Sequence, residues 1–412
     1  MNSDFSVLEC NSITDIRRRI TKVLQDRIDM FPKSKDALIL LKPNLNSDMN
    51  TLTGNTTDLR VIVSVIGFLQ KEGYKNIVIA DGTSSGFYHN HINVISRLKV
   101  ERVAEKLGVK TLDLNNAPHI DIDFGGGFKA KIAKICFDSD FFINLPKLKM
   151  HFEVRMSACL KNLIGCVQGL EKQKVHDDLA ANILKLNQKI KPNLNIVDGL
   201  IVMEGTGPSA GRPAYLGSVV IGFNPYIVDG VCAKLMGWNW RSVPYLRIAQ
   251  DTGLVTAEQS HIIDDFQPSL NREFLRPHKN LLVTIAYHPM LRKYITNLRL
   301  SRFGDYIVSQ TSISKILVKS GLRQDTFIEE DEKIQEIYVD SNCEKSGVCA
   351  DYCPMELNLP DDLGSNDSCV ECLYCFFVCP KKAIKFKSQP GFLTAQIKKY
   401  EAARKVANSA YS

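Results

Sequence analysis

Seven of the twelve cysteines lie in one short stretch, residues 343–379, and their spacing is typical of iron–sulfur chemistry. The second half of the stretch reads Cys369-x2-Cys372-x2-Cys375-x3-Cys379-Pro380. In bacterial proteins this run holds a 4Fe–4S cluster. The first half reads Cys343-x5-Cys349-x3-Cys353-Pro354, which is the same run with Ser346 in place of its second cysteine.

A zinc site is the other interpretation, because Cys-x2-Cys pairs also suit zinc. Three cysteines at successive x2 spacings, followed by x3 and proline, are more than a zinc site needs. Two such runs in tandem, each ending in Cys-Pro, therefore favour iron–sulfur clusters.

The two runs predict two ligand sets that cross between them. In two-cluster ferredoxins the fourth cysteine of each run ligates the cluster of the other run. One predicted set is complete and indicates an ordinary 4Fe–4S cluster; it comprises Cys353, Cys369, Cys372 and Cys375. The other set lacks a thiolate where Ser346 stands; it comprises Cys343, Cys349 and Cys379.

A serine hydroxyl is a poor iron ligand at neutral pH, because its proton is hard to remove. The second set therefore predicts a 3Fe–4S cluster, a 4Fe–4S cluster with one open iron, or an empty site. The likeness to seven-iron ferredoxins, which also lose a cysteine from one run, favours the first. An open iron would be a Lewis acid. Cys159 or Cys166 is a further candidate for the missing ligand.

Upstream of residue 240, strand and helix patterns alternate. Helices are expected at 13–28, 58–72, 95–107, 177–190 and 226–236, and strands at 37–41, 76–80, 109–114, 140–144, 194–197 and 215–222. A hairpin of 120–124 and 128–136 interrupts the alternation. The pattern predicts an α/β fold, with a mainly parallel sheet and helices on both faces.

The chain is long enough for two or three domains. We expect an α/β domain over 1–335 that is irregular and helical from about 241. A small α+β ferredoxin-like domain is expected over 336–390, and a C-terminal helix within 391–412.

In an open parallel sheet, ligands bind beyond the carboxyl ends of the strands. The polar residues after the predicted strand ends are Lys42, Asn44, Asp81, Thr83, Ser84, Lys147, Lys149, His151, Asp198 and Glu204. Their lysines would neutralise a carboxylate or phosphate, so an anionic small-molecule substrate is expected. His151 would act as acid or base. The glycine-rich 204–211 precedes a strand, so it does not predict a dinucleotide site.

The composition limits where the protein is expected to be and which partners it is expected to have. No signal peptide pattern and no apolar run long enough to span a bilayer stands out, and iron–sulfur thiolates need a reducing compartment, so a cytoplasmic protein is expected. The net charge of +7 comes with no nucleic-acid motif, so no nucleic-acid partner is expected. Basic residues gather between 292 and 323, as a solvated helix face or a surface for an acidic partner.

Several motifs in residues 35–240 together resemble the domain-of-unknown-function 362 family, whose members often carry a ferredoxin module. They are Lys42-Pro43-Asn44, the run from Asn144 to His151, the run from Lys161 to Gly165, the run from Ile196 to Pro208, and the run from Asn224 to Gly230. The resemblance implies a cytoplasmic protein of redox metabolism whose large domain has its own site, and it adds Lys161 and Asn162 to the substrate-binding candidates. Asn224 and Ser346 depart from the family pattern, which has Asp and Cys.

These patterns support three hypotheses. The first is a redox enzyme in which a partner protein feeds electrons through the clusters to an anion bound at the strand ends. The second is a non-enzymatic electron-transfer or redox-sensing protein. The third is Lewis-acid chemistry, such as dehydration, at an open iron beside Ser346.

Overall fold

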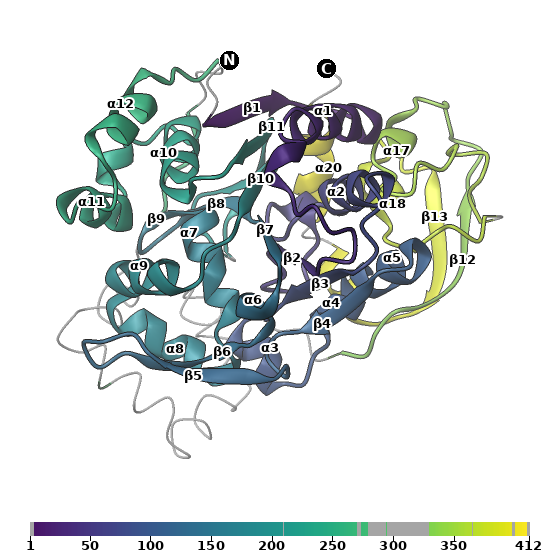
Figure 1. The fold of residues 1–412 in the computed structure, drawn as a ribbon. Coiled ribbons are helices and arrows are strands. Elements are labelled where there is room, and N and C mark those ends of the chain that lie inside the picture. The colour runs from purple at the N-terminus through teal and green to yellow at the C-terminus, as the bar shows by residue number, and fades with distance from the viewer. Residues whose placement is uncertain are drawn as a thin grey trace.

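The structure, a computed structural model, describes residues 4–208, 210–269, 273–278, 294, 329–364, 366–397 and 400–409. The described residues form one mixed sheet of nine strands with helices around it, and two separate two-stranded sheets (Figure 1). Apart from Tyr294, the basic stretch 292–323 that was considered as a partner surface lies outside the described residues.

The large sheet is mainly parallel, as predicted. Its path is β1 (Phe5–Glu9), β11 (Arg212–Gly222), β10 (Leu194–Glu204), β7 (Phe141–Leu145), β2 (Ile39–Pro43), β3 (Ile77–Asp81) and β4 (Lys110–Asp113). The strands from β10 to β4 run parallel, and β11 and β1 are antiparallel additions at one edge. β8 (Lys147–His151) branches off, parallel to β10 and antiparallel to β9 (Arg155–Ser157).

The sheet has a separate apolar core on each face, because successive side chains of a strand point to opposite sides. In β2, Ile39 and Leu41 belong to one core and Leu40 to the other. The first core lies under α1 (Ile13–Gln25), α2 (Leu59–Lys71) and α5 (Val100–Leu107). The second lies under α7 (Cys159–Asn162), α9 (Leu179–Lys189) and α10 (Pro225–Leu235) (Figure 1).

α2 is buried on all sides. Its N-cap is Asp58, whose carboxylate accepts the backbone N–H of Arg60 at 2.9 Å, and every residue from 59 to 66 is buried. A helix that is apolar all round needs cover on its outer side as well as from the sheet. The C-terminal part of the chain provides that cover.

This C-terminal part, residues 333–389, is called the cysteine module below. Its strands β12 (Lys333–Val339) and β13 (Ile384–Gln389) pair antiparallel, and between them lie α17 (Val348–Asp351) and α18 (Tyr374–Val378). The module shares one apolar core with α1 and α2. α20 (Tyr400–Asn408) follows it; the Tyr400 ring stacks on Phe377 at 4.0 Å, and its hydroxyl accepts the N–H of Asn50 at 3.1 Å.

The hairpin is confirmed as β5 (His119–Asp123) and β6 (Lys129–Ala133), but four expectations were wrong in detail. Residues 147–151 form a strand rather than the loop expected after β7. β10 continues to Glu204 instead of ending at Val197, so the glycine-rich segment is the turn between β10 and β11. The expected helix 95–107 is divided into α4 (Val94–Arg97) and α5, because Lys99 between them has a φ of 62°. The last helix consists of α19 (Phe392–Gln396) and α20.

Candidate functional site

β8 carries three of the candidate residues on one face. Lys147, Lys149 and His151 alternate with Leu148 and Met150, which belong to the second apolar core. The period of a strand therefore puts the two lysines and the histidine on the same side of β8. All three side chains are buried.

Two of the predicted lysines form buried ion pairs with predicted aspartates. Lys42, at the end of β2, lies 2.7 Å from Asp81, at the end of β3. Lys147 lies 2.8 Å from Asp198, with both side chains fully buried. Burial raises the pKa of Asp198, and the Lys147 charge opposes that rise. Each pair keeps its two charges together away from water, where an unpaired charge would be costly.

Gly165 is required beside the first pair. A Cβ at this position would lie 2.3 Å from Oδ1 of Asp81 and 2.7 Å from Nζ of Lys42. Both distances are shorter than a van der Waals contact, so any side chain here would displace the pair. The position of Gly165 next to the strand ends is thus part of the site.

Lys149 differs from these two lysines, because its described partners are neutral. Its ammonium donates to Oδ1 of Asn44 at 2.7 Å and to Oδ1 of Asn46 at 2.8 Å. Burial, together with the charges of Lys161 and Lys147, places the pKa of Lys149 well below its ordinary value. A lysine held in this way gives up its proton more readily than an exposed lysine.

Two further lysines complete what we call the lysine cluster, which comprises Lys42, Lys147, Lys149, Lys161 and Lys172. Burial lowers the pKa of Lys161 and that of Lys172 to about 8 each. Lys172 donates to Oδ1 of Asn115 and lies near Asp81. Lys161 is only partly buried, so the cluster reaches the surface there. Two of the five lysines are paired with aspartates, and the carboxylates of Glu153 and Asp113 act on Lys161 and Lys172.

A chain of asparagine amides holds the cluster in place. Asn44 donates to Asn162 at 2.8 Å, Asn162 donates to Asn144 at 2.8 Å, and Asn144 donates to Asn195 at 2.9 Å. Asn44 also accepts from Lys149. Buried polar groups that satisfy one another in this way fix the positions of their neighbours.

The remaining sequence-predicted residues occupy different places. Thr83 is buried and its hydroxyl accepts from Asn115 at 3.2 Å. Ser84 is the N-cap of α3 (Ser85–His89). Glu204 pairs with Arg212 at 2.7 Å and accepts the N–H of Leu275 at 3.0 Å, so these contacts direct it away from the lysines.

His151 is oriented by its own loop. Its Nδ1 accepts the backbone N–H groups of Glu153 at 3.2 Å and Val154 at 3.4 Å, and its ring stacks on Phe152. A nitrogen that accepts two amide hydrogens carries no proton, so the neutral ring holds its proton on Nε2. This geometry suits His151 as a hydrogen-bond donor through Nε2–H.

Sequence reasoning missed Lys172, Asn46 and Asn115. Lys172 stands in the charged run 171–174, which is typical of an exposed surface. Asn46 and Asn115 follow the ends of β2 and β4, so extending the strand-end rule by a few residues would have included them.

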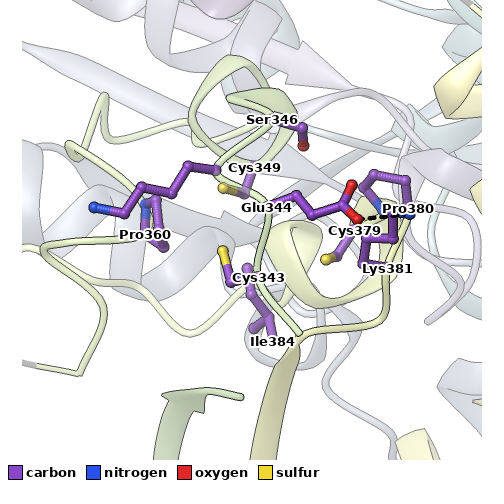
Figure 2. Close-up of a pocket in the computed structure, with 10 residues that line it drawn as sticks. Cys343, Glu344, Ser346, Cys349, Pro360, Cys379, Pro380, Lys381 and Ile384 are labelled. Atoms are coloured by element: carbon purple, nitrogen blue, oxygen red, sulfur yellow. Dashed lines mark ion pairs between the residues drawn. The ribbon is translucent and has the colours of Figure 1, made fainter. Parts of the chain in front are cut away.

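In the cysteine module, one cysteine set surrounds a single pocket. Cys343, Cys349 and Cys379 line a space of about 340 Å³ that includes open solvent, and Ser346 lines it as well (Figure 2). The N–H of Ala383 donates to Sγ of Cys379 at 3.2 Å. Burial, together with the charges of Cys379 and Cys343, raises the pKa of Cys349 to about 11. Cys159 and Cys166 do not line this pocket.

The other four cysteines form a second group. Burial raises the pKa of Cys375, and the charges of Cys353 and Cys369 add to that rise. The pKa of Cys372 is raised well above its ordinary value by burial and then by Cys353, Cys375 and Cys369. These mutual effects require the four thiols to lie close together. Cys349 also acts on Cys375, so the two groups are neighbours.

The donors present in these groups fit iron–sulfur clusters. All seven cysteines are free thiols, and thiolate sulfur is the ligand that such clusters use. Of the eight described non-glycine residues with positive φ, five lie in the module: Lys345, Glu356, Glu371, Leu373 and Lys382. Strained turns of this kind concentrate at ligand-holding segments. Among the described residues, no three His, Cys, Asp or Glu side chains are grouped to hold a single metal ion; a cluster is a larger group, which its thiolates surround.

The part of the chain that contains the parallel sheet is similar to known proteins. Residues 39–234 match the family described as "Domain of unknown function (DUF362)". The matched region, residues 39–234, contains all five lysines of the cluster. It ends before the cysteine module begins.

A curated protein similar to this chain is the "Thylakoid-associated protein sll1697" of Synechocystis sp. (strain ATCC 27184 / PCC 6803 / Kazusa). It is 27% identical over 234 residues, which cover 52% of this chain and 68% of that protein. A solved structure, the lactate racemase apoprotein from Thermoanaerobacterium thermosaccharolyticum, is 14% identical with a TM-score of 0.36; the match covers 52% of this chain and about half, 53%, of that one. In the part of the chain that is described, no helix has both the length and the apolar character needed to cross a membrane.

Proposed function

We propose that the protein is an iron–sulfur redox enzyme. In this proposal a redox partner protein supplies electrons to the cysteine module, and an anionic small molecule is bound by the lysine cluster of the DUF362 region. The clusters would supply one-electron transfer when bound. The observation that carries the proposal is the grouping of the seven cysteines into the two sets that the crossed ferredoxin rule requires.

The lysine cluster supports the substrate part of the proposal. Lys161 and Lys172 have a pKa of about 8, so both are largely protonated at neutral pH and attract an anion. Lys149 donates to two asparagine oxygens, and burial lowers its pKa. His151 offers a hydrogen bond from Nε2–H. Protonated Lys161 and Lys172 can supply the protons that must match electrons added to an oxygen-bearing anion, so the site suits the reduction of such an anion.

The test is to purify the protein anaerobically and measure iron, sulfide and electron paramagnetic resonance, before and after dithionite. About seven irons per chain with a signal in the oxidised state would indicate a 3Fe–4S cluster at the set with Ser346, and about eight irons with signals only on reduction would indicate two 4Fe–4S clusters. Calorimetry with inorganic phosphate and with malonate tests the anion site. A chain that takes up no iron after anaerobic reconstitution would contradict the proposal.

One observation favours a second candidate. Ser346 lines the same pocket as the three cysteines of its set (Figure 2), so a four-iron cluster held there would have one iron facing a hydroxyl instead of a thiolate. Such an iron exchanges ligands and acts as a Lewis acid, as in a dehydration. Under this candidate Ser346→Cys abolishes turnover and keeps the cluster, whereas a redox enzyme keeps its turnover with altered electron transfer.

A further inference from the structure

The two cysteine sets differ in what surrounds them. The set with Cys353, Cys369, Cys372 and Cys375 is called the inner set here, and the set with Cys343, Cys349 and Cys379 the outer set. This inference rests on the proposed function, in which electrons pass from the cysteines to the lysine cluster. The contacts of the residues next to each set indicate which set faces the lysine cluster.

Residues next to the inner set contact the sheet domain. The guanidinium of Arg60 lies over the ring of Tyr352, next to Cys353, at 4.0 Å from the ring centroid. Glu371, between Cys369 and Cys372, pairs with Arg102 of α5. The hydroxyl of Tyr374, between Cys372 and Cys375, accepts the N–H of Leu59 at 3.4 Å. The inner set is therefore held against α2 and α5.

The charged residues next to the outer set pair within the module. Glu344 lies 2.8 Å from Lys381, and Lys345 lies 3.2 Å from Asp361. All four of these side chains are exposed. Figure 2 shows the first pair across the rim of the pocket that the outer cysteines line. The outer set therefore opens to solvent.

A short series of contacts joins the inner set to the lysine cluster. The adjacent N–H groups of Asp58 and Leu59 have different acceptors: Leu59 donates to Tyr374, and Asp58 donates to Oδ2 of Asp198 at 2.7 Å. The same oxygen accepts from Lys147 at 2.8 Å. Tyr374, the first turn of α2, Asp198 and Lys147 thus form one buried, hydrogen-bonded connection.

We propose that the inner set is the exit for electrons toward the lysine cluster and that the outer set is their entry from a low-potential one-electron carrier protein. The closeness of Cys349 to Cys375 links the two sets. Each transfer moves one electron: the carrier is oxidised by one electron, the protein is reduced by one, and no bond forms or breaks. The carrier would approach the pocket that the outer cysteines line (Figure 2).

The test uses the native, iron-loaded protein and a neutral gadolinium chelate, which broadens or relaxes paramagnetic signals only from solvent-accessible centres. The outer signal is identified first as the one that changes in Ser346→Cys. We expect the chelate to relax the outer signal strongly and the inner signal weakly. Equal effects on both signals, or a stronger effect on the inner one, would overturn the inference while leaving the proposed function intact. A protein that binds no iron would contradict both this inference and the proposed function.

A matched pair of variants gives a second measurement. Tyr374→Phe removes the hydroxyl that accepts from Leu59, and Tyr338→Phe makes the same change on the exposed strand β12. We expect Tyr374→Phe to shift the midpoint potential of the inner signal alone, and Tyr338→Phe to shift neither. A shift confined to the outer signal in Tyr374→Phe would overturn the assignment. If Tyr374→Phe does not load iron, the chelate measurement on the native protein decides.

Discussion

The buried pair of Asp58 and Arg60 offers a sharp test of how the module is attached. Arg60 donates to Asp58 through Nη2 at 2.8 Å and through Nε at 3.1 Å, and it also covers the ring of Tyr352. Both side chains of the pair are fully buried. Breaking a buried pair by removing one partner costs about 3–5 kcal/mol, because it leaves an uncompensated charge.

Arg60→Met is expected to cost about 3 kcal/mol, the lower end of that range. Asp58 would keep the N–H of residue 60 and the nearby charge of Lys147, both of which stabilise its carboxylate. Lost cation–π contact with Tyr352 adds about 1 kcal/mol. The measurement is urea unfolding, followed by far-ultraviolet circular dichroism for the fold and by the visible absorbance of the iron-loaded module.

The double variant Asp58→Asn with Arg60→Met separates the charge from the packing. Asparagine keeps the N-cap of α2, since it caps as well as aspartate, and the double variant leaves no unpaired charge. Most of the lost stability should therefore return. The reasoning is refuted if Arg60→Met unfolds at the wild-type urea concentration, or if the double variant is less stable than the single one.

Three other predictions concern the lysine cluster and the outer set. Lys149→Met should weaken malonate binding about tenfold, the effect of losing one hydrogen bond, whereas the exposed Lys174→Met should not; equal affinities in calorimetry would contradict this. Malonate affinity should be highest below pH 8 and fall by about tenfold per pH unit per lysine above it, because Lys161 and Lys172 have a pKa of about 8 in the free protein and the bound anion raises it; a pH-independent affinity would rule out their role. Ser346→Cys should add about one iron per chain and remove the signal of the oxidised protein, as expected for conversion of 3Fe–4S to 4Fe–4S, and an unchanged iron content would show that no three-iron cluster was present.

The sequence predicted those parts of the fold that repeat locally. The apolar runs of β2, β3 and β7 and the amphipathic pattern of α1 could be recognised because burial shows in the residue types themselves. β8 could not be recognised: it contains Lys147 and Lys149, whose burial depends on distant partners such as Asp198 and the asparagine amides. The buried charges of these two lysines are compensated only when folding has brought those partners next to them.

The candidate site was predictable to a similar degree. Lys42 and Asp81 do lie together at neighbouring strand ends, as the strand-end rule implies. Glu204 follows the same rule in sequence, yet the continuation of β10 pairs it with Arg212. Lys172 reaches the site from the charged run 171–174, which is typical of an exposed surface.

The all-round burial of α2 has a consequence for how the protein is made. α2 is made about 300 residues before the last cysteine of the module, since α2 ends at Lys71 and that cysteine is Cys379. During that interval the part of α2 that the module covers stays exposed, while α1, which is made earlier, already packs against it. Exposed apolar surface is where nascent chains aggregate, so the solubility of the newly made chain is linked to completion of the C-terminal module through one helix.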